Sequence, residues 1–136
     1  MSQTNDATLE VVSQWVEKAE SDFKSAAFLL QLKHTCPTDS VCFHVQQCIE
    51  KYVKALLVLT GVDFGRTHHI SMLIELLPEE SRPSLTAEEQ ERLTDYAVTT
   101  RYPGDYDPIT LAEARQAVQL ARRARRQMRQ RLHRAL

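Results

Sequence analysis

Few residues in this chain break a helix, and this scarcity limits the folds that are open to it. Only three glycines and five prolines occur among 136 residues, and the prolines lie in stretches that can connect helices. Between them, apolar residues recur at spacings of three and four, as on a helix that buries one face. No segment alternates like a half-buried strand. We therefore predict an all-α fold, an antiparallel up-and-down bundle of four long helices plus one short helix.

Five helices are predicted, over about residues 8–33, 40–60, 68–77, 86–99 and 110–136. The segments "TAEE" and "TLAE" begin the last two with capping boxes, in which a threonine and a later glutamate each satisfy a backbone N–H. Thr38 or Asp39 can cap the second helix, and Thr67 can cap the third. Gly61 follows the second helix, where a left-handed residue commonly ends a helix.

Two apolar stripes are expected to face the core. The first helix carries Val12, Trp15, Val16, Ala19, Phe23, Ala26 and Leu30. The second carries Cys42, Val45, Ile49, Tyr52, Val53, Leu56 and Leu59.

Length and composition, with 43% hydrophobic and 26% charged residues, are those of one globular domain. We predict a single helical domain over residues 1–136, with residues 1–7 disordered. The three cysteines, Cys36, Cys42 and Cys48, include no C-x-x-C pair, so we expect reduced thiols, no metal site and no cofactor. Because there is no signal-peptide pattern and no long apolar run, we expect a cytoplasmic protein.

Charge is divided unevenly along the chain. Residues 1–113 carry 9 Lys and Arg against 18 Asp and Glu, a formal charge of −9, whereas residues 114–136 carry eight arginines and no acidic residue. A helix dipole favours cations only in the last turn, so it does not explain eight arginines. Either they pair with the acidic body of this or a second subunit, or they bind a nucleic acid backbone.

Polar side chains on the second predicted helix form the first candidate site. His44, Gln47 and Lys51 are spaced by three and four residues, so they lie along one line, apart from the apolar stripe. Such a line can bind a phosphate or a base edge, or it can simply be a solvated face. In "RTHH", Arg66 and His68 lie at the start of the third helix, whose N-terminus would attract anions.

The stretch "VTTRYPGDYDPIT" before the last helix is the second candidate site. It brings Arg101, Tyr102, Asp105 and Tyr106 to a turn at the end of the fourth helix. The arginine can bond the last carbonyls of its own helix. Alternatively, its planar guanidinium can bind a phosphate while a tyrosine stacks on a base.

Four segments together resemble the HEPN (higher eukaryotes and prokaryotes nucleotide-binding) domain family. They are "VEKAESDFKSAAFLL", "CFHVQQCIEKYVKALLVLTGV", "RTHHISMLIELL" and "YAVTTRYPGD". The family pattern is F-H-x-Q-Q-x-x-E-K-x-x-K-A-L-L, then a glycine, R-T-H and an R-Y-P turn. The resemblance covers about residues 15–120, with the motifs in the family's order.

The resemblance implies an α-helical bundle, commonly homodimeric, that acts on or near nucleotides and RNA. Many members are ribonucleases of toxin–antitoxin or defence systems, often encoded beside a minimal nucleotidyltransferase. Their active site is an Arg-x4-6-His motif at the dimer interface, whose arginine corresponds to Arg101. Here the motif reads Arg-x4-Tyr, ending at Tyr106. Tyrosine is a poor base at neutral pH, so cleavage would require His44 or His68 instead.

Three functions follow, in order of preference. The first is a dimeric domain that binds a nucleotide or RNA, or a minimal nucleotidyltransferase. The second is a metal-independent ribonuclease, and the third is a purely structural or oligomerisation module. The candidate catalytic residues are Arg101, Tyr106 and His44. The candidate nucleotide-binding residues are Gln47, Lys51, Arg66, His68, Tyr102 and Asp105.

Overall fold

The computed structural model describes residues 5–98, 104 and 107–135, and this part of the chain is helical without strands. Its five α-helices are α1 (Asp6–Leu30), α2 (Thr38–Leu59), α3 (Ile70–Leu76), α4 (Ala87–Tyr96) and α5 (Leu111–Ala135). Two single 3-10 turns lie at Lys33–Thr35 and Glu79–Ser81. The prediction of an all-α fold is confirmed.

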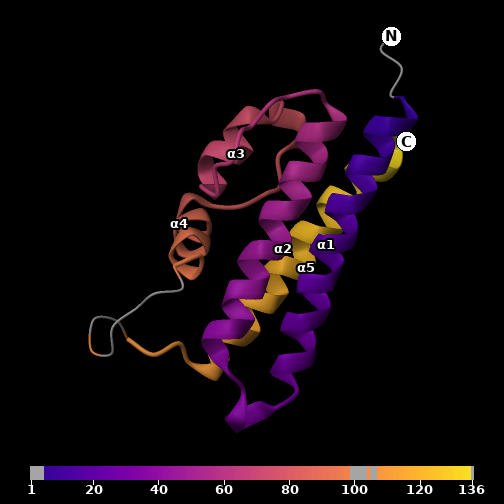
Figure 1. Ribbon diagram of the computed structural model, residues 1–136. Helices are drawn as coiled ribbons and strands as arrows, with labels where there is room; N and C mark the ends of the chain where they lie inside the picture. The colour runs from indigo at the N-terminus through magenta and orange to yellow at the C-terminus, as the bar shows by residue number, and fades with distance from the viewer. Residues whose placement is uncertain (1–4, 99–103, 105–106, 136) are drawn as a thin grey trace.

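Three long helices form the body of the molecule (Figure 1). α1 packs against α2 in the opposite direction, and α5 runs along both of them. The chain returns from the end of α2 to the start of α5 through α3 and α4, which pack on α2 and on each other. This returning arm of the bundle is therefore made of two short helices. α4 is ten residues long and ends at Tyr96, and 3-10 bonds from Ala97 and Val98 tighten its end.

α2 lies at the centre of the bundle, with α1, α5 and the α3–α4 arm around it. It is therefore buried on most of its circumference, and its predicted apolar stripe is buried from Cys42 to Leu56. Four polar side chains are also buried in the described chain: Asp22, Gln46, Glu50 and Lys54. A buried charge requires a partner, so these residues locate the polar networks of the fold.

Helix ends follow the sequence at most positions. Thr86 and Glu89 form the predicted capping box, with bonds of 3.0 and 2.9 Å. Thr110 Oγ1 accepts from the Glu113 N–H at 3.0 Å. Gly61 has the predicted positive φ of 73°, and N–H groups of Gly61 and Val62 donate to the carbonyls of Val58 and Leu57 in a Schellman motif.

Three predicted helix starts are corrected. α1 begins at Asp6 with Asn5 as its cap, two residues before the predicted start. α2 is preceded by Pro37 without a side-chain cap, because Thr38 Oγ1 donates instead to the Ile109 carbonyl at 2.8 Å. α3 begins at Ile70, two residues late, because residue 69 is still extended.

Cys42 and Cys48 are buried and Cys36 is partly buried, and all three are free thiols. Burial raises the pKa of the Cys42 thiol to about 12 and also raises the pKa of Cys48. In the part of the chain that the structure describes, none of the helices has the length and apolarity needed to cross a membrane.

Candidate functional site

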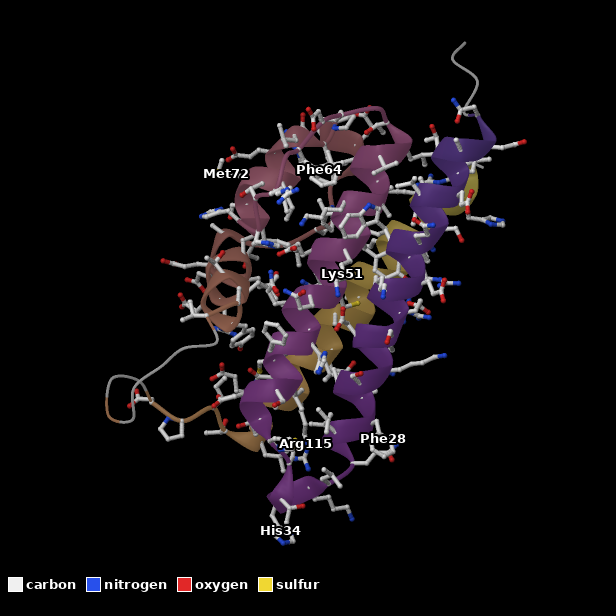
Figure 2. All side chains as sticks on the ribbon, in the orientation of Figure 1. Phe28, His34, Lys51, Phe64, Met72 and Arg115 are labelled. Carbon is white, nitrogen blue, oxygen red and sulfur yellow. The ribbon has the colours of Figure 1, made fainter. Side chains whose placement is uncertain are left out.

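A buried carboxylate holds two of the predicted site residues together. Asp22 on α1 accepts from Lys51 Nζ at 2.6 Å, and its other oxygen lies 2.9 Å from His44 Nδ1. We name these three residues the Asp22 cluster. Its side chains are 12% (Asp22), 30% (His44) and 23% (Lys51) exposed, so the cation and the imidazole are partly open to solvent. Lys51 lies between α1 and α2 near the middle of the molecule (Figure 2).

The geometry of the Asp22 cluster decides what its groups can offer to a ligand. A neutral imidazole that donates from Nδ1 to a carboxylate keeps a lone pair on Nε2. The ammonium of Lys51 has three N–H bonds and gives one to Asp22, so it can donate others. The cluster can therefore present a proton acceptor beside a cationic donor.

A second buried carboxylate organises the rest of the polar face of α2. Glu50 Oε2 lies 3.0 Å from Lys54 Nζ and 2.9 Å from His68 Nδ1. Its Oε1 accepts from the Gln46 amide at 2.8 Å, and the Gln46 Oε1 accepts from Gln47 at 2.6 Å. We name these five residues the Glu50 cluster. It repeats the arrangement of the Asp22 cluster, because one carboxylate again joins a lysine and a histidine.

Aromatic rings enclose the buried cation of the Glu50 cluster. Lys54 Nζ lies 5.4 Å from the centroid of the Trp15 ring and 5.6 Å from that of Phe64. Those two rings meet edge to face at 6.2 Å. The lysine and Glu50 are 5% and 2% exposed, whereas the side chain of His68 is 72% exposed. The histidine is thus the part of this cluster that solvent or a ligand can reach.

A third network joins α1, α2 and α5. Glu20 accepts two bonds from the Arg125 guanidinium, each of 2.6 Å, and a further bond from the Tyr52 hydroxyl. Arg129 Nη1 lies 3.2 Å from the same carboxylate. These bonds, above all those from Arg125, lower the pKa of Glu20 to about 2 from its ordinary value of 4.5. We name these four residues the Glu20 cluster.

The structure brings some predicted site residues together and separates others. His44 and Lys51 meet on Asp22, whereas Gln47 and His68 belong to the Glu50 cluster. Arg66 is exposed in the connection between α2 and α3, outside any helix N-terminus, because α3 starts four residues later. The other predicted residues, Arg101, Tyr102, Asp105 and Tyr106, lie outside the described residues.

The described ends of the segment that contains Arg101 are attached to α2 and α5. Tyr96 donates to Glu113 Oε2 at 2.6 Å and contacts the Cys42 thiol, and burial raises the pKa of this tyrosine. Cys42 and His44 are two positions apart on α2, about 200° around the helix. The imidazole of the Asp22 cluster therefore faces α1, on the side of α2 away from Tyr96.

Comparison with known proteins places this arrangement in a family. Residues 12–130 match the HEPN domain. The chain belongs to the HEPN domain family. It is 35% identical over 100 residues to the protein named "Putative toxin MJ1304" of Methanocaldococcus jannaschii, a match that spans 68% of this chain and 63% of that protein. A crystal structure of ST0689, an archaeal HEPN homologue, superposes with a TM-score of 0.67 at 26% identity, covering 88% of this chain and 96% of that one.

The structure shows which contacts the polar residues of the HEPN pattern on α2 make in this chain. In F-H-x-Q-Q-x-x-E-K-x-x-K, the histidine and the first lysine meet Asp22, and the glutamines, glutamate and second lysine form the Glu50 cluster. Sequence reasoning missed Asp22 and Glu20, the α1 partners of these networks. Asp22 carried a usable signal, because it follows Ala19 by three residues and precedes Ala26 by four, on the apolar stripe.

Within the described residues, histidine, cysteine, aspartate and glutamate side chains nowhere gather in a group of three or more that could hold a metal ion.

Proposed function

We propose that this HEPN protein binds a nucleotide or RNA, with a phosphate at the Asp22 cluster and Arg101 as a second cation. The observation that carries the proposal is a lysine and a histidine held side by side, partly exposed, by one buried carboxylate. Because Asp22 fixes both side chains before a ligand arrives, little rotamer entropy remains to be lost on binding. Charge-assisted bonds from Lys51 would supply much of the affinity.

The remaining predicted residues take supporting roles in this proposal. Gln47 and His68 would contact the ligand from the Glu50 cluster, and Arg66 would reach it from the connection after α2. Tyr102 and Tyr106 would stack on bases, and Asp105 would accept from a base or ribose.

Calorimetric titration with ATP and with a short single-stranded RNA tests this proposal. Lys51→Met should weaken binding about tenfold to a hundredfold, because a charge-assisted bond contributes roughly 1.5–3 kcal/mol. Lys24→Met is the matched control, since Lys24 is an exposed lysine of α1 outside the cluster. A wild-type protein that gives no heat with either ligand contradicts the proposal, as does equal weakening by both substitutions.

RNA cleavage is the second candidate function, favoured by the histidines that carboxylates hold through Nδ1. His44 Nε2 would take the proton of a ribose 2′-hydroxyl, whose oxygen would attack the adjacent phosphorus. The bond from phosphorus to the 5′-oxygen would break, and that oxygen would take a proton from water, leaving a 2′,3′-cyclic phosphate and a 5′-hydroxyl. Arg101 would stabilise the charge that develops on the phosphate.

Incubation of labelled RNA with wild type and variants tests cleavage. Removal of a general base should slow cleavage about 100-fold or more, so His44→Ala should be nearly inactive. Arg101→Ala should also be nearly inactive, because the charge that develops on the phosphate loses its cation. His68→Ala shows whether the second carboxylate-held histidine is the base instead. Equal cleavage by wild type and Arg101→Ala, or no cleavage by either, would exclude the ribonuclease.

The biological setting that we propose is a toxin–antitoxin or defence pair in the cytoplasm, in which a homodimer of this chain acts with a minimal nucleotidyltransferase. The name of the M. jannaschii relative supports the toxin role. Induced expression should slow bacterial growth, and co-expression of the nucleotidyltransferase should restore it and allow co-purification. Normal growth together with failure to co-purify would count against this setting.

A further inference from the structure

The structure divides seven of the eight arginines of α5 into two groups with different surroundings. The first group is paired inside the molecule. Arg125 bonds Glu20, Arg123 bonds Glu89 at 2.9 Å, and Arg131 donates to the Glu80 carbonyl at 3.2 Å. These three side chains attach α5 to α1 and to the segment around α4. Intramolecular pairing thus accounts for only part of the positive charge.

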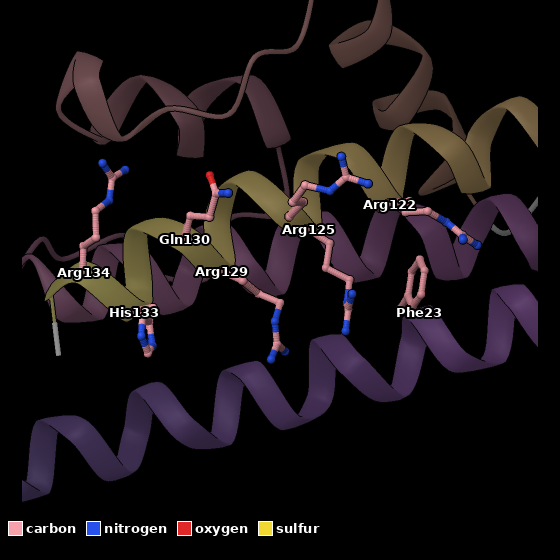
Figure 3. Close-up of a pocket in the computed structure, with 8 residues that line it drawn as sticks. Phe23, Arg122, Arg125, Arg129, Gln130, His133 and Arg134 are labelled. Atoms are coloured by element: carbon pink, nitrogen blue, oxygen red, sulfur yellow. The ribbon is translucent and has the colours of Figure 1, made fainter.

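The second group surrounds a groove of about 750 Å³ along the last half of α5 (Figure 3). We name it the α5 arginine groove. Besides the paired Arg125, six cationic and aromatic residues line it: Phe23, Arg122, Arg126, Arg129, His133 and Arg134. Phe23 comes from α1, and the others come from α5. All five α5 residues are exposed, and within the described chain no ion pair is found for Arg122, Arg126 or Arg134.

The spacing of these side chains makes one continuous cationic surface. Arg122, Arg126, Arg129 and His133 follow each other at intervals of four, three and four, so they form a row on α5. The row is about 16 Å long at 1.5 Å per residue. Figure 3 shows Arg129 and His133 pointing towards α1, whereas Arg134 projects on the other side of α5. The cationic side chains near the C-terminal end of α5 thus lie on both sides of that helix.

Little negative charge offsets this row. Glu20 is the carboxylate that pairs with Arg129, and Arg125 already bonds both of its oxygens. Arg129 shares Glu20 at 3.2 Å, but its side chain remains 48% exposed. α5 itself has no acidic residue after Glu113. An anion in the groove would meet largely unpaired guanidinium groups, which bind phosphate through planar pairs of N–H donors.

We propose that the α5 arginine groove binds the sugar–phosphate backbone of single-stranded RNA. A row of cations in a groove suits a narrow chain with regularly repeated charge. A second copy of this protein fits less well, because its exposed glutamates are divided among α1, α3, α4 and the 79–80 turn. The inference rests on the proposed RNA binding and deepens it, since it adds the α5 arginines as a second contact surface.

Fluorescence anisotropy with a labelled oligouridylate of roughly 15 nucleotides tests the groove. The triple variant Arg122→Gln, Arg126→Gln, Arg134→Gln removes three exposed guanidinium groups that have no ion pair in the described structure. At about 0.1 M salt it should bind roughly tenfold to a hundredfold more weakly than wild type. The slope of log K against log salt should become about 2 less negative, because each lost phosphate contact contributes about 0.7 for a single strand.

A second triple variant supplies the control: Lys18→Gln, Arg92→Gln, Arg115→Gln. It removes the same charge from exposed positions outside the groove, and Arg115 lies at the opposite end of α5 (Figure 2). Its affinity for RNA should stay within about threefold of wild type, because it loses only long-range Coulomb attraction, which salt screens. Sedimentation of all three proteins shows whether the substitutions change the oligomeric state.

Each outcome decides between explanations. Weak binding by the groove variant alone supports the groove. If both triple variants weaken RNA binding equally, the weakening depends only on net charge, and the proposal is overturned. If the groove variant binds RNA as wild type does but has a changed oligomeric state, the groove is a contact between copies of this chain, and the proposal is overturned. A wild type that binds no RNA contradicts both the proposed function and the groove, whereas wild-type binding that the groove variant retains contradicts the groove alone.

Discussion

At the scale of single residues, three carboxylates on α1 and α2 explain most of the polar chemistry inside this protein. Asp22, Glu20 and Glu50 each accept from at least two side-chain donors. In the described chain, every buried side-chain nitrogen and oxygen has a hydrogen-bond partner. Removal of one partner should therefore cost more than an exposed ion pair would, since the other group would remain buried without compensation.

The Glu20 cluster makes stability depend on pH. The pKa of Glu20 is lowered to about 2 in the folded chain from its ordinary 4.5. Its stabilisation is therefore complete above pH 4.5 and disappears as the pH falls towards 2, because the proton then binds the unfolded chain first. We expect this carboxylate to contribute about 2–3 kcal/mol to the free energy of unfolding at neutral pH.

Urea unfolding of wild type and Glu20→Gln between pH 7 and pH 2 measures this contribution. The glutamine variant should be less stable at pH 7, and the two proteins should converge at the acid end. Glu17→Gln, an exposed position of the same helix, should keep the wild-type pH dependence. A constant difference between wild type and Glu20→Gln across this range would contradict the assigned pKa.

The cysteines give a second test at this scale. Cys42 and Cys48 are buried thiols with raised pKa values, so thiolate is scarce and reagents cannot reach it. The disulfide reagent DTNB at pH 8 should label the folded chain only at the partly buried Cys36, and all three thiols in urea. Cys36→Ser should abolish labelling of the folded protein. Rapid labelling of that variant would show that the packing around α2 opens readily.

At the scale of elements, every other helix packs against α2, and the stability of α4 depends on the contacts at its ends. α4 has only ten residues, too few to be stable alone in water. Its capping box holds the first turn, and Arg123 of α5 bonds the Glu89 of that box through both carboxylate oxygens. The start of α4 is thus stabilised by a local cap and by a contact across the fold.

Thr86→Ala should lower the free energy of unfolding by about 1 kcal/mol, the usual cost of losing a threonine N-cap. Its hydroxyl accepts from the Glu89 N–H at 3.0 Å, and alanine leaves that donor without its partner. Chemical denaturation provides the measurement. Ser25→Ala is a suitable comparison, because Ser25 bonds a carbonyl within α1 and caps no helix end. A Thr86→Ala protein as stable as Ser25→Ala would show that the cap contributes nothing.

At the scale of the whole molecule, α5 is both a core element and a charged surface. One of its faces buries Ala114, Val118, Ala121, Met128 and Leu132 among other apolar residues. Its paired arginines attach it to α1 and to the α4 region, and four others, Arg122, Arg126, Arg129 and Arg134, surround the groove. A purely structural function for this helix therefore leaves the groove arginines unexplained.

Truncation after Ala121 should unfold the protein rather than merely dissociate an oligomer. It removes Met128 and Leu132 from the core, each contributing roughly 2–4 kcal/mol, together with the Arg125 pair with Glu20. This loss is comparable to the entire stability of a typical domain. Circular dichroism should show a lost cooperative thermal transition. The groove triple variant, which leaves the core intact, should keep the wild-type transition; a folded, monomeric truncation would contradict this view of α5.

The sequence by itself determined the helical character of the chain, the apolar stripes of α1 and α2, the capping box at Thr86 and the left-handed Gly61. Each of these depends on residues close together in the chain, so periodicity and local backbone chemistry suffice. The family pattern could also be identified from the sequence, because its motifs are short and occur in a fixed order. The start of α2 was placed wrongly, because the Thr38 hydroxyl bonds the distant Ile109 carbonyl instead of acting as a local cap.

Only the tertiary structure decided which polar residues become partners. His44 and Lys51 meet because Asp22 faces them from another helix, 22 and 29 positions away. The eight arginines of α5 look alike in the sequence, yet Arg125 bonds a carboxylate 105 positions earlier in the chain. Its neighbour Arg126 is exposed and has no ion pair within the described residues. Spacing along one helix fixes the direction of a side chain, but packing between helices decides which groups it contacts. The burial and the partners of these residues therefore depend on the tertiary structure.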